Sequence, residues 1–188
     1  LIADHAVDPI NALASARDTA CEALTAMQDA LTELDVGSLD GDALMGTVLS
    51  VETTRRALDA ANAHLLGALE TSGVTETEAG LGTKRWKANR THCSDASVAR
   101  ELTIARTLAR FCGFAEELAK GVISTDHVLA LAAVCNDRII DGLIEAEDQL
   151  LVSAKLHRYR IFVTFLRRVA ATLDEDGCEP DCGDRDTA

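Results

Sequence analysis

The residues best suited to chemistry in this sequence are the cations of residues 84–110, called here the basic island. The island has a net charge of +5, whereas residues 1–83 have −11 and the whole chain of 188 residues has −13. Lysine and arginine side chains contact the phosphates of nucleic acids. DNA binding is therefore one expected role of the island, with contacts at Lys84, Arg85, Lys87, Arg90 and Arg100.

The helices expected around these cations partly oppose that role. A short helix around Trp86, a turn at residues 91–94 and a second helix capped by Ser94 follow the order of a helix-turn-helix. In that motif the start of the second helix enters the major groove, but here it carries Asp95, whose charge repels phosphates. The alternative is that the island neutralises acidic neighbours in the fold or in a partner.

Cysteine and histidine offer a weaker signal for zinc. Cys178 and Cys182 have a spacing compatible with two ligands of one site, and His92 and Cys93 form a second, distant pair. A structural zinc site usually has four ligands, and nothing in the spacing brings the two pairs together. Cys178 and Cys182 are therefore weak metal candidates, and any missing ligands are expected beyond residue 188.

The sequence contains no complete catalytic set. It lacks a recognisable Ser/His/Asp or Cys/His arrangement, a glycine-rich phosphate loop and an HExxH motif. His127 follows a Ser124 helix cap and is interpreted as a helix-surface residue. We expect no cofactor in this chain, and enzymatic activity stays undecided.

The composition predicts an all-α protein. Hydrophobic residues make up 47% of the chain but aromatic residues only 3%, so alanine and leucine carry most of the burial. Such residues favour packing of helix on helix. The strongly acidic balance suits a soluble cytoplasmic protein and argues against binding nucleic acid or anionic lipid over the whole surface. The apolar runs are also too short to span a bilayer, so no membrane partner is expected.

Two long helices are expected in residues 1–73. Asp8 and Pro9 are suited to start the first, with Asp8 as N-cap, and apolar residues then recur at spacings of three, four and seven up to Leu34. The second is expected from about Gly41 to Ser72, with Gly73 as its C-cap. Together they predict a long antiparallel hairpin, whose apolar seam could support a homodimer.

Shorter elements are expected after the hairpin. Residues 74–83 read as a linker rich in glycine and threonine, and residues 84–173 as a compact bundle of short helices. Gly113 is expected to break one helix, and single helices are expected near residues 137–154 and 157–173. Residues 174–188 have a net charge of −6 and are expected to form a disordered tail.

Several segments of this chain resemble the actinobacterial family called domain of unknown function 222, or the thirteen-E-twelve repeat family. The segments are GLGTKRW at residues 80–86, SDASVARELTIARTLARF at 94–111, AKGVISTDHVLALAAV at 119–134 and RRVAATLDEDGCEPD at 167–181. The resemblance implies an N-terminal domain of an HNH-endonuclease-like protein. Any nuclease activity would then reside in a C-terminal module beyond residue 188, which is one expected partner of this domain.

The resemblance therefore favours a non-catalytic accessory role. The domain would position or restrain the nuclease and would contact DNA through the basic island. The alternative is an acidic helical module for protein interaction or dimerisation, without a role in DNA binding.

Overall fold

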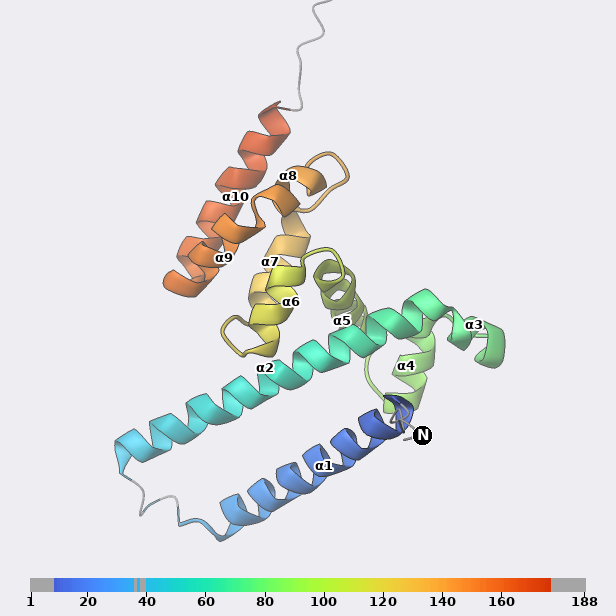
Figure 1. The fold of residues 1–188 in the computed structure, drawn as a ribbon, viewed down its shortest axis with the longest axis vertical. Helices are drawn as coiled ribbons and strands as arrows, with labels where there is room; N and C mark the ends of the chain where they lie inside the picture. Colours follow the sequence, from blue (N-terminus) through green and yellow to red (C-terminus); the bar gives the residue numbers. More distant parts are fainter. Residues whose placement is uncertain (1–8, 36, 38–39, 177–188) are drawn as a thin grey trace, which may run out of the picture. The chain divides into compact units, whose positions relative to one another are not determined.

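The computed structural model describes residues 9–35, 37 and 40–176, which form helices and no strand, so the all-α class is confirmed (Figure 1). The chain divides into two compact units, residues 1–48 and residues 49–188. This division falls inside a helix, whereas the sequence predicts a boundary after residue 73. The described helices are α1 (Pro9–Glu33), α2 (Gly41–Ser72), α3 (Val74–Ala79), α4 (Thr83–Thr91), α5 (Asp95–Leu108), α6 (Cys112–Ala119), α7 (Thr125–Val134), α8 (Ile140–Glu145), α9 (Glu147–Leu156) and α10 (Tyr159–Asp176).

The first unit contains α1 and the first two turns of α2. Proline suits the first position of α1 because its missing N–H group has no intrahelical partner there. The predicted cap, Asp8, lies outside the described residues. The described apolar side chains of this unit, Leu13 and Leu31 among them, remain largely exposed. The antiparallel pairing of the two long helices stays a prediction.

The two ends of α2 agree with the sequence prediction. At its start the Asp40 carboxylate accepts a hydrogen bond from the Ala43 N–H at 2.7 Å. At its end Gly73 has φ 64°, a left-handed conformation that costs glycine little. Local capping chemistry therefore determines both ends of this 32-residue helix.

The core of the second unit lies where α5, α6, α7, α9 and α10 meet. Phe111, Phe114 and Phe162 are fully buried, and neighbouring rings in this trio lie 6.2 and 6.4 Å apart between centroids. Leucine and other aliphatic residues surround them, and each such burial contributes about 1.5–3 kcal/mol.

Two segments differ from the sequence prediction because of tertiary contacts. The predicted linker contains α3, and the buried hydroxyls of Thr75 and Thr83 join α3 to α4 at 3.0 Å. Gly113 does not break a helix but lies in the first turn of α6. A Cβ atom there would approach Leu151 Cδ1 to 2.7 Å, so glycine allows α6 to pack closely on α9.

The C-terminal helices also differ from the prediction. The single helix expected near residues 137–154 is two helices, α8 and α9, with Ala146 between them. The last helix, α10, continues to Asp176, so the start of the predicted disordered tail is helical. The rest of that tail, residues 177–188, lies outside the described residues.

Candidate functional site

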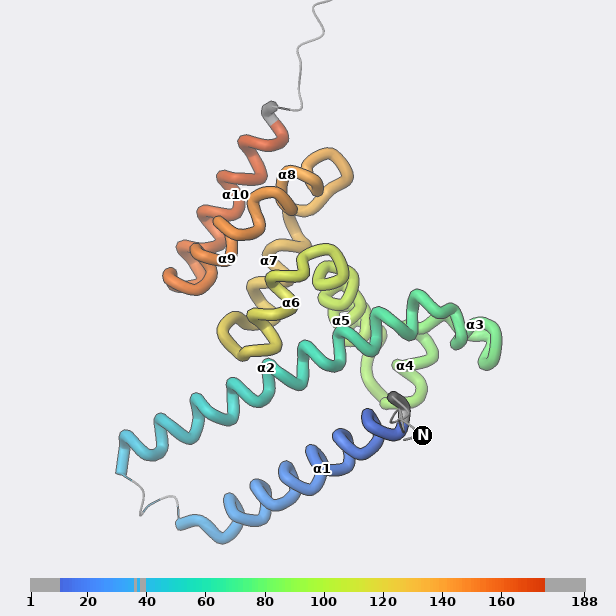
Figure 2. The backbone as a smooth tube through the Cα atoms, viewed as in Figure 1, coloured from blue at the N-terminus to red at the C-terminus, as the bar shows by residue number. Residues whose placement is uncertain are grey.

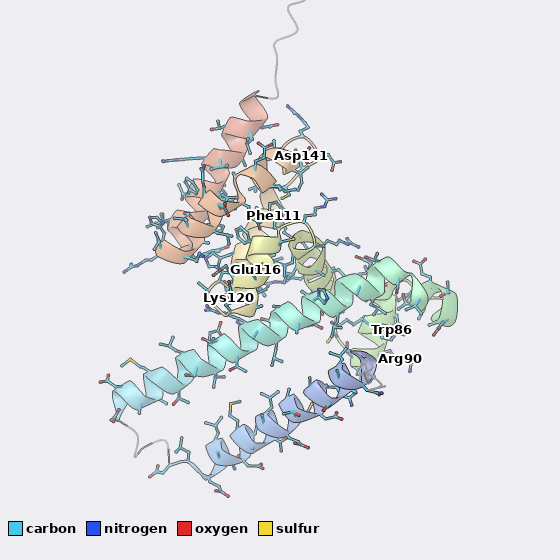
Figure 3. All side chains as sticks on the ribbon, in the orientation of Figure 1. Trp86, Arg90, Phe111, Glu116, Lys120 and Asp141 are labelled. Carbon is cyan, nitrogen blue, oxygen red and sulfur yellow. The ribbon has the colours of Figure 1, made fainter. Side chains whose placement is uncertain are left out.

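The basic island lies on α4, α5 and the turn between them. Helix α5 begins after Ser94, whose hydroxyl accepts a hydrogen bond from the Ser97 N–H at 3.1 Å. Helix α4 ends at His92, which has φ 57° and reverses the chain. Figure 3 shows Trp86 and Arg90 on α4. The two helices pack against each other, so the expected helix–turn–helix order is present in this segment.

Lys87 is the most enclosed cation of the island. Its Nζ lies 2.5 Å from the Glu101 carboxylate and 3.1 Å from the side-chain amide oxygen of Asn62, and its side chain is 15% exposed. These contacts connect α4 with α5 and α2. Because the pair is partly buried, solvent screens its attraction less than that of an exposed pair. Lys87 therefore acts within the fold.

Two further predicted cations also have acidic partners in the same unit. The Arg100 guanidinium donates to the Asp126 carboxylate at 2.9 Å, which joins α5 to α7. Lys84 lies 3.8 Å from Asp95, the residue expected to oppose phosphate binding. Both pairs are largely exposed, so each contributes about 0–1 kcal/mol.

Arg106 extends this pattern, although it was not among the predicted contacts. Its Nη2 and Nε donate to the two Glu70 oxygens at 2.6 and 2.8 Å, which joins α5 to α2. These hydrogen bonds lower the pKa of Glu70 below its usual value. With this pair, helix α5 is tied to α2, α4 and α7 by ion pairs, and four cations of the island act within the bundle.

Arg85 and Arg90 are the predicted contacts that differ from the rest. Both are exposed, and neither has an ion pair with any described residue. Arg85 lines a cleft of about 570 Å³ between α2, α3, α4 and α5, together with Lys84 and Arg106. The same cleft also contains Glu70 and Glu76, so its charge is mixed.

Among the described residues, the structure shows no zinc site built from the weak candidates. Cys178 and Cys182 lie outside them, while His92 and Cys93 are exposed in the turn after α4. Within residues 9–35, 37 and 40–176 no cluster of three or more His, Cys, Asp or Glu side chains could hold a metal ion.

His127 is not the surface residue that the sequence suggested. Its ring is half-buried, with centroids 5.3 Å from Tyr159 and 5.0 Å from Phe162. Burial lowers the pKa of His127, and the positive charge of Arg56 lowers it further. Its buried Nε2 has no hydrogen-bond partner among the described atoms. The packing of α10 on α7 explains the burial, which the sequence of α7 alone could not show.

The pair of His127 and Ser124 serves as a helix cap. Ser124 Oγ lies 2.9 Å from His127 Nδ1, and the Ser124 backbone N–H donates to the same nitrogen at 3.3 Å. This is a capping box in which histidine takes the place of the usual Glu or Gln. The His127 ring thus accepts a hydrogen bond from the backbone N–H of the N-cap residue, and this bond stabilises the start of α7.

The turn before this cap also anchors α2. Arg56 Nη1 donates to the Gly121 carbonyl at 3.0 Å, and Gly121 has φ 73°. A Cβ atom on Gly121 would lie 2.5 Å from Thr53 Cγ2, so only glycine allows α2 to approach here. Figure 2 shows this tight turn between α6 and α7. The segment AKGVISTDH therefore joins three helices through its backbone.

Comparison with known protein families identifies the family of this chain. A family model described as "Domain of unknown function (DUF222)" matches residues 45–187. The chain belongs to the DUF222 family. The matched region covers helices α3 to α10 and most of α2. It includes the capped start of α7 and the turn at Gly121.

No curated protein and no solved structure matches this DUF222 chain. In the part of the chain that the structure describes, every helix is too short or too polar to cross a membrane.

Proposed function

We propose that this DUF222 domain is a non-catalytic accessory domain of an HNH-endonuclease-like protein, in which it positions or restrains the nuclease. The observation that supports the proposal most is the use of the island's cations inside the fold. Lys87, Arg100 and Arg106 hold α5 against its neighbours. A bundle braced in this way suits a scaffold whose outer surfaces meet other domains.

DNA contact is a subsidiary part of this proposal and is restricted to Arg85 and Arg90. These two exposed cations lack acidic partners among the described residues, so they can reach phosphates without breaking an ion pair. Each phosphate contact changes the slope of log K against log salt by about −0.9. Two contacts therefore predict weak binding with a shallow salt dependence.

A salt titration with a 20-base-pair duplex tests the DNA contact. The R85A/R90A variant should bind more weakly than the parent, with its salt slope reduced by about 2. Arg17→Ala, which removes an exposed cation of α1, is the control and should leave binding unchanged. Equal binding by the parent and R85A/R90A removes DNA from the proposal.

The accessory role is tested through the gene and through activity. Reading the coding sequence past Ala188 should reveal an HNH motif, whereas a stop codon there would favour the interaction module. The isolated chain, incubated with plasmid DNA and Mg²⁺, Mn²⁺ or Zn²⁺, should leave the DNA intact. Cleavage by the purified chain would contradict a non-catalytic role.

The second candidate function is dimerisation, and an exposed stripe on α2 favours it. Val51, Leu58 and Leu65 recur every seven residues and are 37%, 44% and 51% exposed. A different face of α2 supplies Ala63 and Leu66 to the core. A heptad spacing of this kind is typical of a seam between two helices. The occupant expected on this stripe is the same helix of a second copy.

Light scattering after size exclusion, over a range of concentrations, tests this candidate. The parent should show a dimer, and L58E/L65E should be a monomer with unchanged helix content by circular dichroism. A monomer for the parent at all concentrations would exclude homodimerisation through α2.

A further inference from the structure

A groove runs along the outer side of the last two helices. It has a volume of about 480 Å³ and is formed by residues 149–153 of α9, His157 and residues 160–168 of α10. These helices follow one another in the chain and lie side by side (Figure 1). The lining residues are Gln149, Val152, Ser153, His157, Arg160, Ile161, Thr164, Phe165 and Arg168.

The groove exposes an apolar surface. Val152 and Ile161 are 53% and 51% exposed, and Phe165 is half-buried beside them. Leu156, at the end of α9, is 76% exposed, and Tyr159 follows it at the start of α10. The opposite face of α10 is the one that enters the core, through Phe162 and Leu166. Contiguous exposed apolar residues of this kind mark sites of protein interaction.

The charge of the groove is unusual for this chain. Arg160 and Arg168 lie eight residues apart on α10, or about 12 Å along the helix. Both are exposed, and neither has an ion pair with a described residue. The lining contains no Asp or Glu, although the chain has 31 acidic residues. The groove therefore combines an apolar floor with two cations that lack carboxylate partners.

We propose that this groove docks an acidic amphipathic segment of a partner protein. The apolar side chains of that segment cover Val152, Ile161 and Phe165, and its carboxylates pair with Arg160 and Arg168. The spacing of the two arginines fits a segment of two to three helical turns. This inference does not depend on the accessory role proposed above.

A nucleic acid fits the groove less well. Phosphates would find Arg160 and Arg168 but would lie beside an exposed valine and isoleucine that offer no hydrogen bonds. An amphipathic peptide satisfies both features, because burial of apolar surface supplies affinity and the charges supply orientation. The observations thus favour a protein segment, and DNA is kept as a competing outcome of the test.

Fluorescence anisotropy with three labelled probes tests the proposal. The probes are a 16-residue helical peptide with leucines on one face and glutamates on the other, the same peptide with lysine for each glutamate, and a 20-base-pair DNA duplex. The parent chain should bind the acidic peptide at least tenfold more tightly than the lysine peptide. Absence of binding to the acidic peptide, or equal binding of both peptides, contradicts the proposal.

Variants place the binding in the groove. R160E/R168E should weaken acidic-peptide binding at least tenfold, and V152S/I161S should weaken it several-fold. R17E/R110E makes the same change in net charge at exposed positions outside the groove and should leave binding within twofold of the parent. All substituted side chains are exposed, and circular dichroism should show the helix content of the parent in each variant.

A measurement on the unaltered chain completes the test. Titration of the isotope-labelled parent with the acidic peptide should shift backbone amide signals of residues 149–168 and leave those of α4 unchanged. Shifts confined to α2 or α4 would overturn the assignment. The parent could instead bind the DNA duplex more tightly than it binds the acidic peptide, and R160E/R168E could lose that DNA binding. This result would make the groove a nucleic-acid site.

Discussion

Two groups of cations in this DUF222 domain have opposite surroundings. In the basic island, Arg100 and Arg106 pair with Asp126 and Glu70 from other parts of the chain, and Lys87 pairs with Glu101 of the island itself. In the groove between α9 and α10, Arg160 and Arg168 have no such partners among the described residues and lie beside exposed apolar side chains. The region with the stronger local charge in the sequence is therefore the one in which several cations already have carboxylate partners in the fold.

This difference shows why cation density is a poor guide to function in an acidic protein. With 31 acidic residues in the chain, cations on packed helices often meet carboxylates, as Lys87, Arg100 and Arg106 do. The groove escapes this because its lining has none. Changes in the braced region should therefore reduce stability, whereas changes in the groove should reduce binding alone.

The largest effect expected in the braced region is that of Gly121→Val. The substitution forces a β-branched residue into a left-handed conformation and brings Cβ to 2.5 Å from Thr53 Cγ2. Together these should lower the free energy of unfolding by about 2–4 kcal/mol. Gly46→Ala in α2, where a new Cβ meets nothing within 4 Å, is the control and should raise it by about 0.5–1 kcal/mol. Urea unfolding measures both, and a stable Gly121→Val would refute the close approach.

The next effect is that of Lys87→Met. The Glu101 carboxylate would lose its partner between α4 and α5, at an expected cost of about 1–2 kcal/mol in unfolding free energy. Arg90→Met changes the same charge on the same helix but breaks no ion pair, so its effect should stay within about 0.5 kcal/mol. Equal losses for the two variants in urea would mean that Lys87 does not brace the bundle.

A smaller, pH-dependent effect is expected at His127. Burial lowers its pKa in the folded state, so the unfolded state binds the proton first as the pH falls. The stability that the neutral His127 ring contributes is fully present above the ordinary pKa of 6.5. This contribution is lost as the pH falls from there through the lower pKa of the folded state. The charged groups acting on it are Arg56, which opposes protonation, and Asp126, which favours it.

His127→Gln tests this prediction because glutamine can still accept the capping hydrogen bond without titrating. The variant should lose part of the decrease in thermal midpoint that is expected for the parent below pH 6.5. The exposed His64, replaced by Gln, is the matched control and should retain that decrease. An unchanged pH profile for His127→Gln would show that the ring is not held in its neutral form.

The smallest effect on stability is expected in the groove itself. Arg160→Ala and Arg168→Ala break no described ion pair and should change the unfolding free energy by less than about 0.5 kcal/mol each. A loss comparable to that of Lys87→Met would mean that these arginines brace the fold, and the contrast between the two regions would disappear.

The parts of the fold that depend on neighbouring residues could be predicted from the sequence. Ser94 caps α5, Gly73 ends α2, and the bounds of α2 agree with its predicted range. These features arise within one or two helical turns, where capping and backbone conformation act locally. The resemblance to DUF222 lies in segments with the same local features. The family match confirms that the chain belongs to DUF222.

The features that depend on distant residues could not be predicted. Arg106 meets Glu70, which is 36 residues earlier in the chain, and Arg100 meets Asp126, which is 26 residues later. Gly113 looked like a helix breaker because the close approach of Leu151 cannot be read from its neighbours. The groove was missed for the same reason, since only packing shows which face of α10 is buried.

One spectrum tests the contrast between the two regions most directly: the arginine Nε–H signals during titration with the acidic peptide. We predict that the signals of Arg160 and Arg168 shift, because these side chains have no carboxylate partner in the described chain. The Arg106 signal should stay in place, because its Nε–H already donates to Glu70 at 2.8 Å. A shift of the Arg106 signal, with the signals of Arg160 and Arg168 unchanged, would contradict the account.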